Sequence, residues 1–354
     1  MVPVVDLSRR AEALAPGFDA AVARVLSSGR FLLGAELEAL EDALVDWSGQ
    51  GHAVGVSSGA SAIQLALSAA GIGPGDEVLV PAFTAAPTAS AVCAVGAVPV
   101  PVDVDPTTAL VEPGQWEACR TERTRAIVVV HLYGRPAALP TTDLAVIEDA
   151  AQAHGALSPA PRNSLATVYS FYPTKNLGGI GDGGAVVTDD AELAARVRRL
   201  RVHGMEEHYV HVDRSQNFRM SELEAAWLRL ALDRLEAGND RRRAIAGHYR
   251  GAAPLEWQAD HPEHVHHLAV FRSADRRRAR ETLSREGVAT AIHYPLSLTQ
   301  QPAYRELTRR PCPESEAWAA SCVTVPCFPE LRDDEVERVA EALGRLAADG
   351  VADG

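Results

Sequence analysis

Short apolar runs of strand length recur along the first half of the chain, separated mostly by loops or by stretches with helical periodicity. Seven such runs are present, at 53–56, 77–80, 98–102, 126–130, 144–148, 166–170 and 184–188. Continuous apolar runs indicate strands buried on both faces, as in a largely parallel sheet covered by helices. The pattern therefore predicts an α/β fold built on a largely parallel, doubly wound, seven-stranded sheet.

After residue 189 the pattern changes. Helices are predicted at 190–201, 221–236, 275–286 and 332–347, with strands at 265–272 and 288–293. Helices and strands in this mixture are typical of an α+β unit. A chain of 354 residues with 47% apolar positions can bury one large core and a smaller one. We therefore expect a large domain over 1–236 and a small C-terminal domain over 237–354.

Charge and cysteine content narrow the classes of partner. The net charge of −13 argues against nucleic acid or an anionic membrane as the main partner. Residues 78–102 carry no charge, but their four prolines disfavour a membrane-spanning helix. The five cysteines lack metal-binding spacing, and the N-terminus shows no secretory pattern. A cytoplasmic location is expected.

The strongest chemical signal is a lysine paired with an upstream acid. Lys175 lies in the string SFYPTKNLG, and Asp149 lies 26 residues before it in IEDAAQAH. Burial can remove the proton from such a lysine, and an acid at the end of an apolar strand can hold a cationic ring nitrogen. These are the two requirements of pyridoxal phosphate chemistry, so the pair predicts a lysine-bound cofactor.

Several ordered motifs extend this signal over nearly the whole chain. They include LSSGRFLLGAELEALEDAL, GIGPGDEVLVPAFT, IEDAAQAHGA, SFYPTKNLGGIGDGGAVVTDD, NFRMSELEAA and IHYP. With them, the chain resembles the DegT/DnrJ/StrS family of pyridoxal-phosphate sugar aminotransferases. The resemblance implies the aspartate aminotransferase fold, also called fold type I, and a homodimer with active sites shared between the subunits.

The resemblance also implies roles for individual residues. Lys175 would bind the cofactor covalently and move a proton during amino transfer, and Asp149 would face the pyridine nitrogen. Gln152 would lie beside the ring hydroxyl. The phosphate would be held by Gly59, Ala60 and Ser170, and by Asn217 of the neighbouring subunit. His154, His293 and Tyr294 are the candidates for contact with the substrate.

The chain departs from the family pattern at four places. Ala60 stands where threonine is usual, so one hydroxyl toward the phosphate is missing, although Ser61 is a possible substitute. Ala85 replaces an aromatic residue that commonly stacks on the cofactor ring. The stretch between Gly155 and Ser170 is shorter than usual, and Thr299 replaces a histidine. These departures concern the grip on the cofactor and the substrate pocket.

Short motifs elsewhere suggest other functions. Residues 55–59 satisfy GxSxG, so a serine hydrolase using Ser57 is an alternative, but the same turn can cradle a phosphate at a helix N-terminus. The GxGxxG at 179–184 precedes a strand, whereas a dinucleotide fingerprint opens a helix. The histidines at 261, 264, 266 and 267 invite a zinc interpretation, yet adjacent strand residues face opposite ways, so no metal is expected.

Taken together, the residues and the resemblance predict an enzyme. It would transfer an amino group by a ping-pong mechanism, from glutamate or glutamine to a keto sugar expected to be nucleotide-linked. A keto-cyclitol acceptor is the close alternative. Retention of Lys175 disfavours a sugar dehydratase, and a non-catalytic regulator that binds the cofactor is a further alternative.

Overall fold

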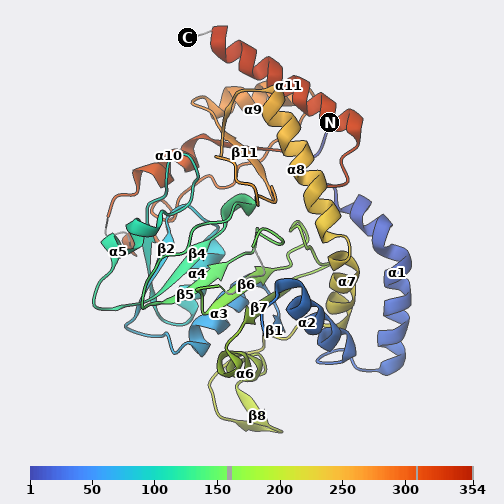
Figure 1. Cartoon of the computed structure of the whole chain (residues 1–354), viewed down its shortest axis with the longest axis vertical. Coiled ribbons are helices and arrows are strands. Elements are labelled where there is room, and N and C mark those ends of the chain that lie inside the picture. The colour runs from blue at the N-terminus through green and yellow to red at the C-terminus, as the bar shows by residue number, and fades with distance from the viewer. Residues whose placement is uncertain (158–161, 308–309, 353–354) are drawn as a thin grey trace.

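A central seven-stranded sheet forms the framework of the computed structural model, which describes residues 1–157, 162–307 and 310–352 (Figure 1). The strands of this sheet are β1 (His52–Val56), β2 (Glu77–Pro81), β3 (Val98–Val102), β4 (Thr124–Val130), β5 (Ala145–Asp149), β6 (Ala166–Ser170) and β7 (Gly184–Thr188). Their order is β1-β7-β6-β5-β4-β2-β3. Only β7 runs against its neighbours; the other pairings are parallel. The predicted seven-stranded, largely parallel sheet is therefore confirmed.

Helices cover both faces of this sheet. The α-helices of the described chain, those of the smaller core included, are α1 (Leu7–Ser28), α2 (Ala35–Ser48), α3 (Gly59–Ala69), α4 (Ala86–Ala94), α5 (Pro113–Cys119), α6 (Ala191–Leu200), α7 (Glu222–Leu232), α8 (Leu235–Ala252), α9 (Arg276–Arg285), α10 (Pro313–Ser321) and α11 (Asp333–Ala352). Alternate strand residues belong to different cores. Tyr169 and Val187 pack with residues of α2 and α7, whereas Val168 and Val186 pack with residues of α3, α4 and α6. Because both faces are buried, the strands read as continuous apolar runs.

A second, smaller core lies around a three-stranded sheet of β10 (Glu256–Trp257), β11 (Ala269–Arg272) and β12 (Cys322–Val325). In Figure 1, α9 and α11 lie at this end of the molecule, and α8 runs from α7 up to α11. Val2 from the N-terminus is also part of this core. The domain boundary at residue 237 stays a prediction; this position falls in the first turn of α8.

The elements after residue 189 differ from the predicted ones in three places. The strand predicted at 265–272 begins at Ala269, because the backbone N–H groups of Val265 and Leu268 donate to carbonyls of Gly134 and Tyr133 instead. The segment 288–293 makes only isolated bridges. The helix predicted at 221–236 is interrupted between α7 and α8. The remaining short elements are β8 (Met205–Glu207), β9 (Val210–His211) and 3-10 turns at Leu132–Gly134 and Arg305–Leu307.

The sheet topology gathers several loops at one edge. Strands β2, β4, β5 and β6 are parallel, and β1 shares their direction because it is antiparallel to β7, which is antiparallel to β6. Their carboxyl ends therefore meet at the same edge, the usual place for ligand sites in such sheets. None of the helices in the described part of the chain has the length and apolar composition of a membrane span.

Glu222, at the start of α7, caps the N-terminus of α2. Gly34, the residue before α2, provides no side-chain cap. The buried Glu222 carboxylate accepts hydrogen bonds from the backbone N–H groups of Gly34 (2.8 Å), Glu36 (2.8 Å) and Leu37 (3.4 Å). A Cβ at position 34 would lie 2.7 Å from a Glu222 oxygen and would push the carboxylate out of its present position. One side chain thus joins two helices that are far apart in sequence.

Replacing Glu222 by alanine should lower the free energy of unfolding by about 1–3 kcal/mol, because it leaves buried N–H groups without partners. Glu222→Gln should cost less, since the amide oxygen still accepts hydrogen bonds. Glu38→Ala, which removes an exposed acid from the same turn, is the matched control. Denaturant unfolding measures all three. Equal stability of Glu222→Ala and Glu38→Ala would contradict the capping role.

Candidate active site

A cavity of about 610 Å³ opens at the carboxyl edge of the sheet. Its walls come from the start of α3, the loop between β2 and α4, the ends of β5 and β6, the loop after β6, and two segments from the second half of the chain. Eight of the ten predicted site residues line it: Gly59, Ala60, Asp149, Gln152, Ser170, Lys175, His293 and Tyr294. Residues spread over more than two hundred positions thus meet around one space.

Lys175 lies on the loop that follows β6 and borders the cavity. Its N–H donates to the Tyr172 carbonyl (2.8 Å), and Arg10 of α1 donates to its carbonyl (3.0 Å). The same guanidinium pairs with Glu330 (3.3 Å). Burial lowers the pKa of the Lys175 amine to about 8, and the charge of Asp149 acts in the opposite direction. Burial outweighs the attraction of the Asp149 charge, so the amine can lose its proton near neutral pH.

Asp149 ends β5 and is buried at the base of the cavity. The hydroxyl of Thr88 donates to one carboxylate oxygen (2.9 Å), and the N–H of Ala151 donates to the other (3.1 Å). Burial raises the pKa of Asp149, while these two hydrogen bonds and the charge of Lys175 act to lower it. The carboxylate is therefore fixed in direction and suited to a cationic partner in the cavity.

The N-terminus of α3 faces the cavity beside Ser170. A Cβ at Gly59 would lie 2.5 Å from the Ser170 Cβ, so only glycine allows this close approach. The first N–H groups of a helix lack partners within the helix and attract anions. The hydroxyl of Ser61 is engaged in a capping box with Ser58, accepting from its N–H and donating to its carbonyl (both 2.8 Å). It does not replace the hydroxyl missing at Ala60.

The opposite wall is a hydrogen-bonded group of side chains. The Gln152 oxygen accepts from the N–H of Tyr133 (2.6 Å), and its amide nitrogen donates to the Tyr294 hydroxyl (2.9 Å). Burial raises the pKa of Tyr294 to about 12, so it stays protonated. His293 contacts the Thr324 hydroxyl (2.9 Å), and burial lowers its pKa to about 4. Neutral donors and acceptors therefore line this side.

Two predicted site residues lie outside the lining. His154 is fully buried and packs against Tyr169 and Phe171, with ring centroids 5.2 and 6.0 Å away. Burial lowers its pKa to about 3. Asn217 is exposed, and its side-chain oxygen accepts a hydrogen bond from Arg219 (2.9 Å). The roles given to these two residues stay predictions.

The structure also locates the departures and the rival motifs. Ala85 lines the cavity, whereas the Thr299 hydroxyl donates to Glu316 (3.0 Å). Ser57 donates to the Ser61 hydroxyl (3.1 Å). The glycine-rich string 179–184 leads into β7 and opens no helix. Within the shortened stretch after Gly155, residues 158–161 lie outside the described residues.

Among the site residues that the sequence did not indicate, Thr88 and His267 make the most informative contacts. Thr88 donates a hydrogen bond to Asp149 and lies in the uncharged segment 78–102. A polar side chain shortly after β2 in this segment is the feature of the sequence that could have indicated it. His267 lines the cavity, and its Nδ1 lies 3.1 Å from the Asn176 side chain next to Lys175. Its position among several histidines suggests a metal ligand and not a cavity residue.

Comparisons with known proteins bear directly on this geometry. Residues 13–344 match the model of the DegT/DnrJ/EryC1/StrS aminotransferase family. The chain belongs to this family. It is a pyridoxal-phosphate-dependent aminotransferase of α/β fold. The serine hydrolase and regulator alternatives are therefore set aside.

Individual relatives align with this chain over almost their whole length. The chain is 42% identical to the dTDP-3-amino-3,4,6-trideoxy-alpha-D-glucose transaminase of Streptomyces venezuelae, covering 98% of this chain and 96% of the relative. It is 39% identical to a UDP-N-acetyl-3-dehydro-alpha-D-glucosamine 3-aminotransferase of Acidithiobacillus ferrooxidans, with 97% of each covered. The crystal structure of S. venezuelae DesV with a ketimine intermediate superposes with a TM-score of 0.92 at 41% identity, covering 98% of both chains.

The cavity of this aminotransferase suits pyridoxal phosphate. The N-terminus of α3 and Ser170 form the anion cradle, which Gly59 leaves open. Asp149 would face the ring nitrogen and Lys175 would bind the cofactor. When bound, the cofactor supplies an electron sink for chemistry at the amino-bearing carbon. Lys175, with its lowered pKa, would take up and return a proton there.

The rate at which cofactor-free enzyme captures pyridoxal phosphate should rise with pH with a midpoint near 8, because only the neutral Lys175 amine reacts. In Asp149→Asn the midpoint should move to lower pH, because the charge that favours the protonated amine is gone. Turnover should fall by roughly 10²-fold or more. Asp182→Asn, at another cavity residue, is the control. An unchanged midpoint in Asp149→Asn would remove the coupling between the two residues.

Ala60→Thr should tighten pyridoxal phosphate binding by about 1 kcal/mol, the usual net contribution of one hydrogen bond. The new hydroxyl would lie in the first turn of α3, where the Ser61 hydroxyl is already occupied. Ala60→Val adds similar bulk without the hydroxyl and should bring no gain. Cofactor titration of the three proteins decides; equal affinities for the threonine and valine variants would show that the hydroxyl does not reach the phosphate.

Proposed function

We propose that this enzyme transfers an amino group from glutamate or glutamine to the ketone of a nucleotide-linked sugar. The observation that carries the proposal is the Lys175 amine, whose pKa burial lowers to about 8, together with Asp149 in the lining of one cavity. The acceptor class rests on relatives named as dTDP-sugar and UDP-sugar transaminases, 42% and 39% identical over almost the whole chain.

The proposal includes a ping-pong order, because donor and acceptor would react in the same cavity. The donor leaves as a keto acid after giving up its amino group, and the acceptor then enters and leaves as an amino sugar. Both partners need the same lysine to move a proton, so they bind in turn. The neutral wall of Gln152, His293 and Tyr294 would orient hydroxyl groups without adding charge.

Incubation with nitrogen-labelled glutamate or glutamine and a panel of keto compounds tests this function. The panel should pair each nucleotide-linked keto sugar with its free sugar and include keto-cyclitols. We expect the label in the nucleotide-linked amino sugar, and release of keto acid from the donor alone in an amount equal to the enzyme. Lys175→Ala should show neither. Label only in cyclitols would favour the alternative acceptor, and no label in any product would refute the proposal.

We further propose a homodimer in which Asn217 reaches the cofactor phosphate of the neighbouring subunit. Asn217 is exposed and does not line the cavity of its own chain. Large apolar side chains nearby in sequence are also exposed: Tyr209 (79%), Val210 (49%) and Val212 (51%). Tyr209 and Val210 belong to the hairpin of β8 and β9, and Figure 1 shows β8 projecting from the bottom of the molecule. Such side chains favour burial against a partner.

Mixing Lys175→Ala and Asn217→Asp enzymes under subunit exchange tests the shared site. Each homodimer should be impaired, because one lacks the lysine and the other sets an acid against the phosphate. Random pairing gives half heterodimers, each with one intact site, so activity should recover to about a quarter of wild type. Lys175→Ala mixed with Asp149→Asn is the control and should not recover, because both residues belong to the same subunit's site. Failure of the Asn217 mixture to recover would place Asn217 elsewhere.

A further inference from the structure

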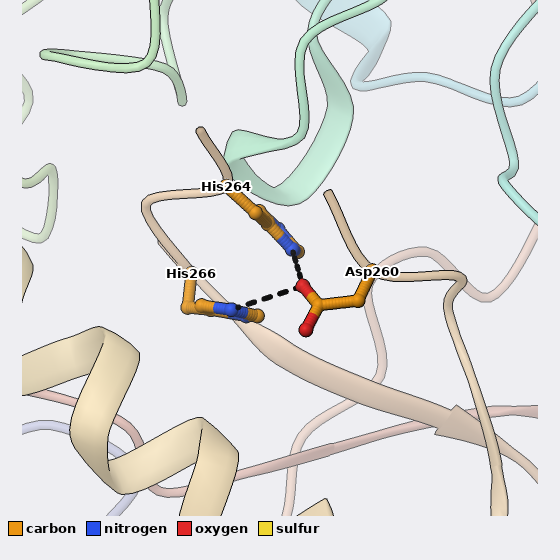
Figure 2. Close-up of side chains that lie close together, drawn as sticks. All are labelled: Asp260, His264 and His266. Atoms are coloured by element: carbon orange, nitrogen blue, oxygen red, sulfur yellow. Dashed lines mark ion pairs between the residues drawn. The ribbon is translucent and has the colours of Figure 1, made fainter. Parts of the chain in front are cut away.

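A second cluster of ionisable side chains lies outside the cavity, on the segment that leads into β11. Asp260, His264 and His266 each direct one potential ligand atom inward, and these three atoms lie within 4.8 Å of one another. Figure 2 shows both imidazole rings pointing at the Asp260 carboxylate. Asp260 Oδ1 lies 3.6 Å from His264 Nδ1 and 3.5 Å from His266 Nε2. His267 is not part of the cluster, since its ring contacts Asn176.

The tautomer of His264 is set by the backbone. Its Nε2 lies 3.2 Å from the Tyr133 carbonyl, which can only accept, so Nε2 carries the hydrogen. A neutral imidazole has one N–H, and Nδ1 therefore presents a lone pair. His264 is 2% exposed, and its Nδ1 has no hydrogen-bond partner among the described residues. The lone pair instead faces a carboxylate oxygen, an arrangement that a cation bound between the two atoms would stabilise.

We propose that Asp260, His264 and His266 form a binding site for a divalent transition-metal ion, with zinc as the ion that best suits two imidazoles and one carboxylate. The hydrogen bond from His264 to a backbone carbonyl is the arrangement that orients metal-binding histidines. The Asp260 side chain is 55% exposed, so water can complete the coordination. This inference reverses the expectation drawn from the adjacent pair His266 and His267.

Two guanidinium groups face the cluster and oppose a cation. Arg243 donates to the His264 carbonyl (3.3 Å) and pairs with Asp240 (2.8 Å). Arg250 donates to the Gln258 carbonyl (2.6 Å) and lies over the Trp257 ring. Their charges, together with the three-ligand set, predict weaker binding than at a closed four-ligand zinc site.

The position of the site suggests its role. The residues that follow the cluster, His267 and Leu268, line the active-site cavity. Their segment is held by backbone hydrogen bonds from Val265 to Gly134 and from Leu268 to Tyr133. A metal ion would fix the same segment from its other side. The site is therefore structural, and it supports one wall of the cavity.

Equilibrium dialysis of chelator-treated, cofactor-loaded enzyme against zinc tests the site. We expect one zinc per chain, with binding at least about tenfold weaker in Asp260→Asn and lost in His264→Gln. His261→Gln changes a histidine of the same segment that is outside the cluster, and it should bind like wild type. Cobalt(II) bound in place of zinc should show the visible absorption bands of a metal ion with few ligands. These bands should be absent in Asp260→Asn. The cofactor spectrum reports whether each variant is folded.

Thermal unfolding gives a second measurement. Zinc should raise the midpoint of wild type and of His261→Gln but not of Asp260→Asn, since an ion stabilises only the form that binds it. The partly exposed Asp260 keeps the test decisive if His264→Gln fails to fold. Zinc binding that is absent in wild type, or that persists unchanged in Asp260→Asn, would overturn the proposal. Persistence would place the ion at other histidines.

Discussion

The site depends on two opposite charges held in one partly enclosed space. Removing a lysine and an aspartate from water is unfavourable, and their mutual attraction offsets only part of that cost. For Lys175 burial dominates, which leaves its amine with a pKa of about 8. For Asp149 the hydroxyl of Thr88 and the N–H of Ala151 keep the carboxylate oriented. An enzyme that must bind an aldehyde cofactor through an amine needs this balance.

The sheet makes the balance possible, because it brings both residues to one edge. Asp149 is the last residue of β5, and the register pairs it with Val168, two residues before the end of β6. The lysine loop starts directly after β6. The neighbouring position on β5 serves the structure instead: Glu148 faces the other way, contacts His131 (3.0 Å) and pairs with Arg162. Although burial acts to raise the pKa of Glu148, these partners lower it to about 2. Because successive side chains of a strand point to opposite faces, Glu148 and Asp149 lie on different sides of the sheet.

Much of this could be predicted from the sequence, for physical reasons. The seven strands could be predicted because both faces of the sheet are buried, which makes the strands continuous apolar runs. The lysine and the aspartate could be predicted because the sequences around them are distinctive. Contacts between distant segments could not be predicted in the same way. Strand β11 begins only at Ala269 because residues before it donate hydrogen bonds to Gly134 and Tyr133. The Ser61 hydroxyl is occupied because it takes part in the cap of a helix. His264 and His266, two residues apart, direct their rings to the same carboxylate, whereas the adjacent pair His266 and His267 predicts rings that face opposite ways.

The hydrogen bonds of Arg10 bear on how the protein is completed during synthesis. This guanidinium, ten residues from the start, donates to the carbonyls of Pro173 and Lys175 and to the carboxylate of Glu330. Two residues 320 positions apart therefore join in supporting the lysine loop. A ribosome that has released the whole large sheet has still not delivered Glu330. The loop acquires its full set of contacts only after that residue has emerged, so a product that stops short of it keeps the reactive lysine without its native support.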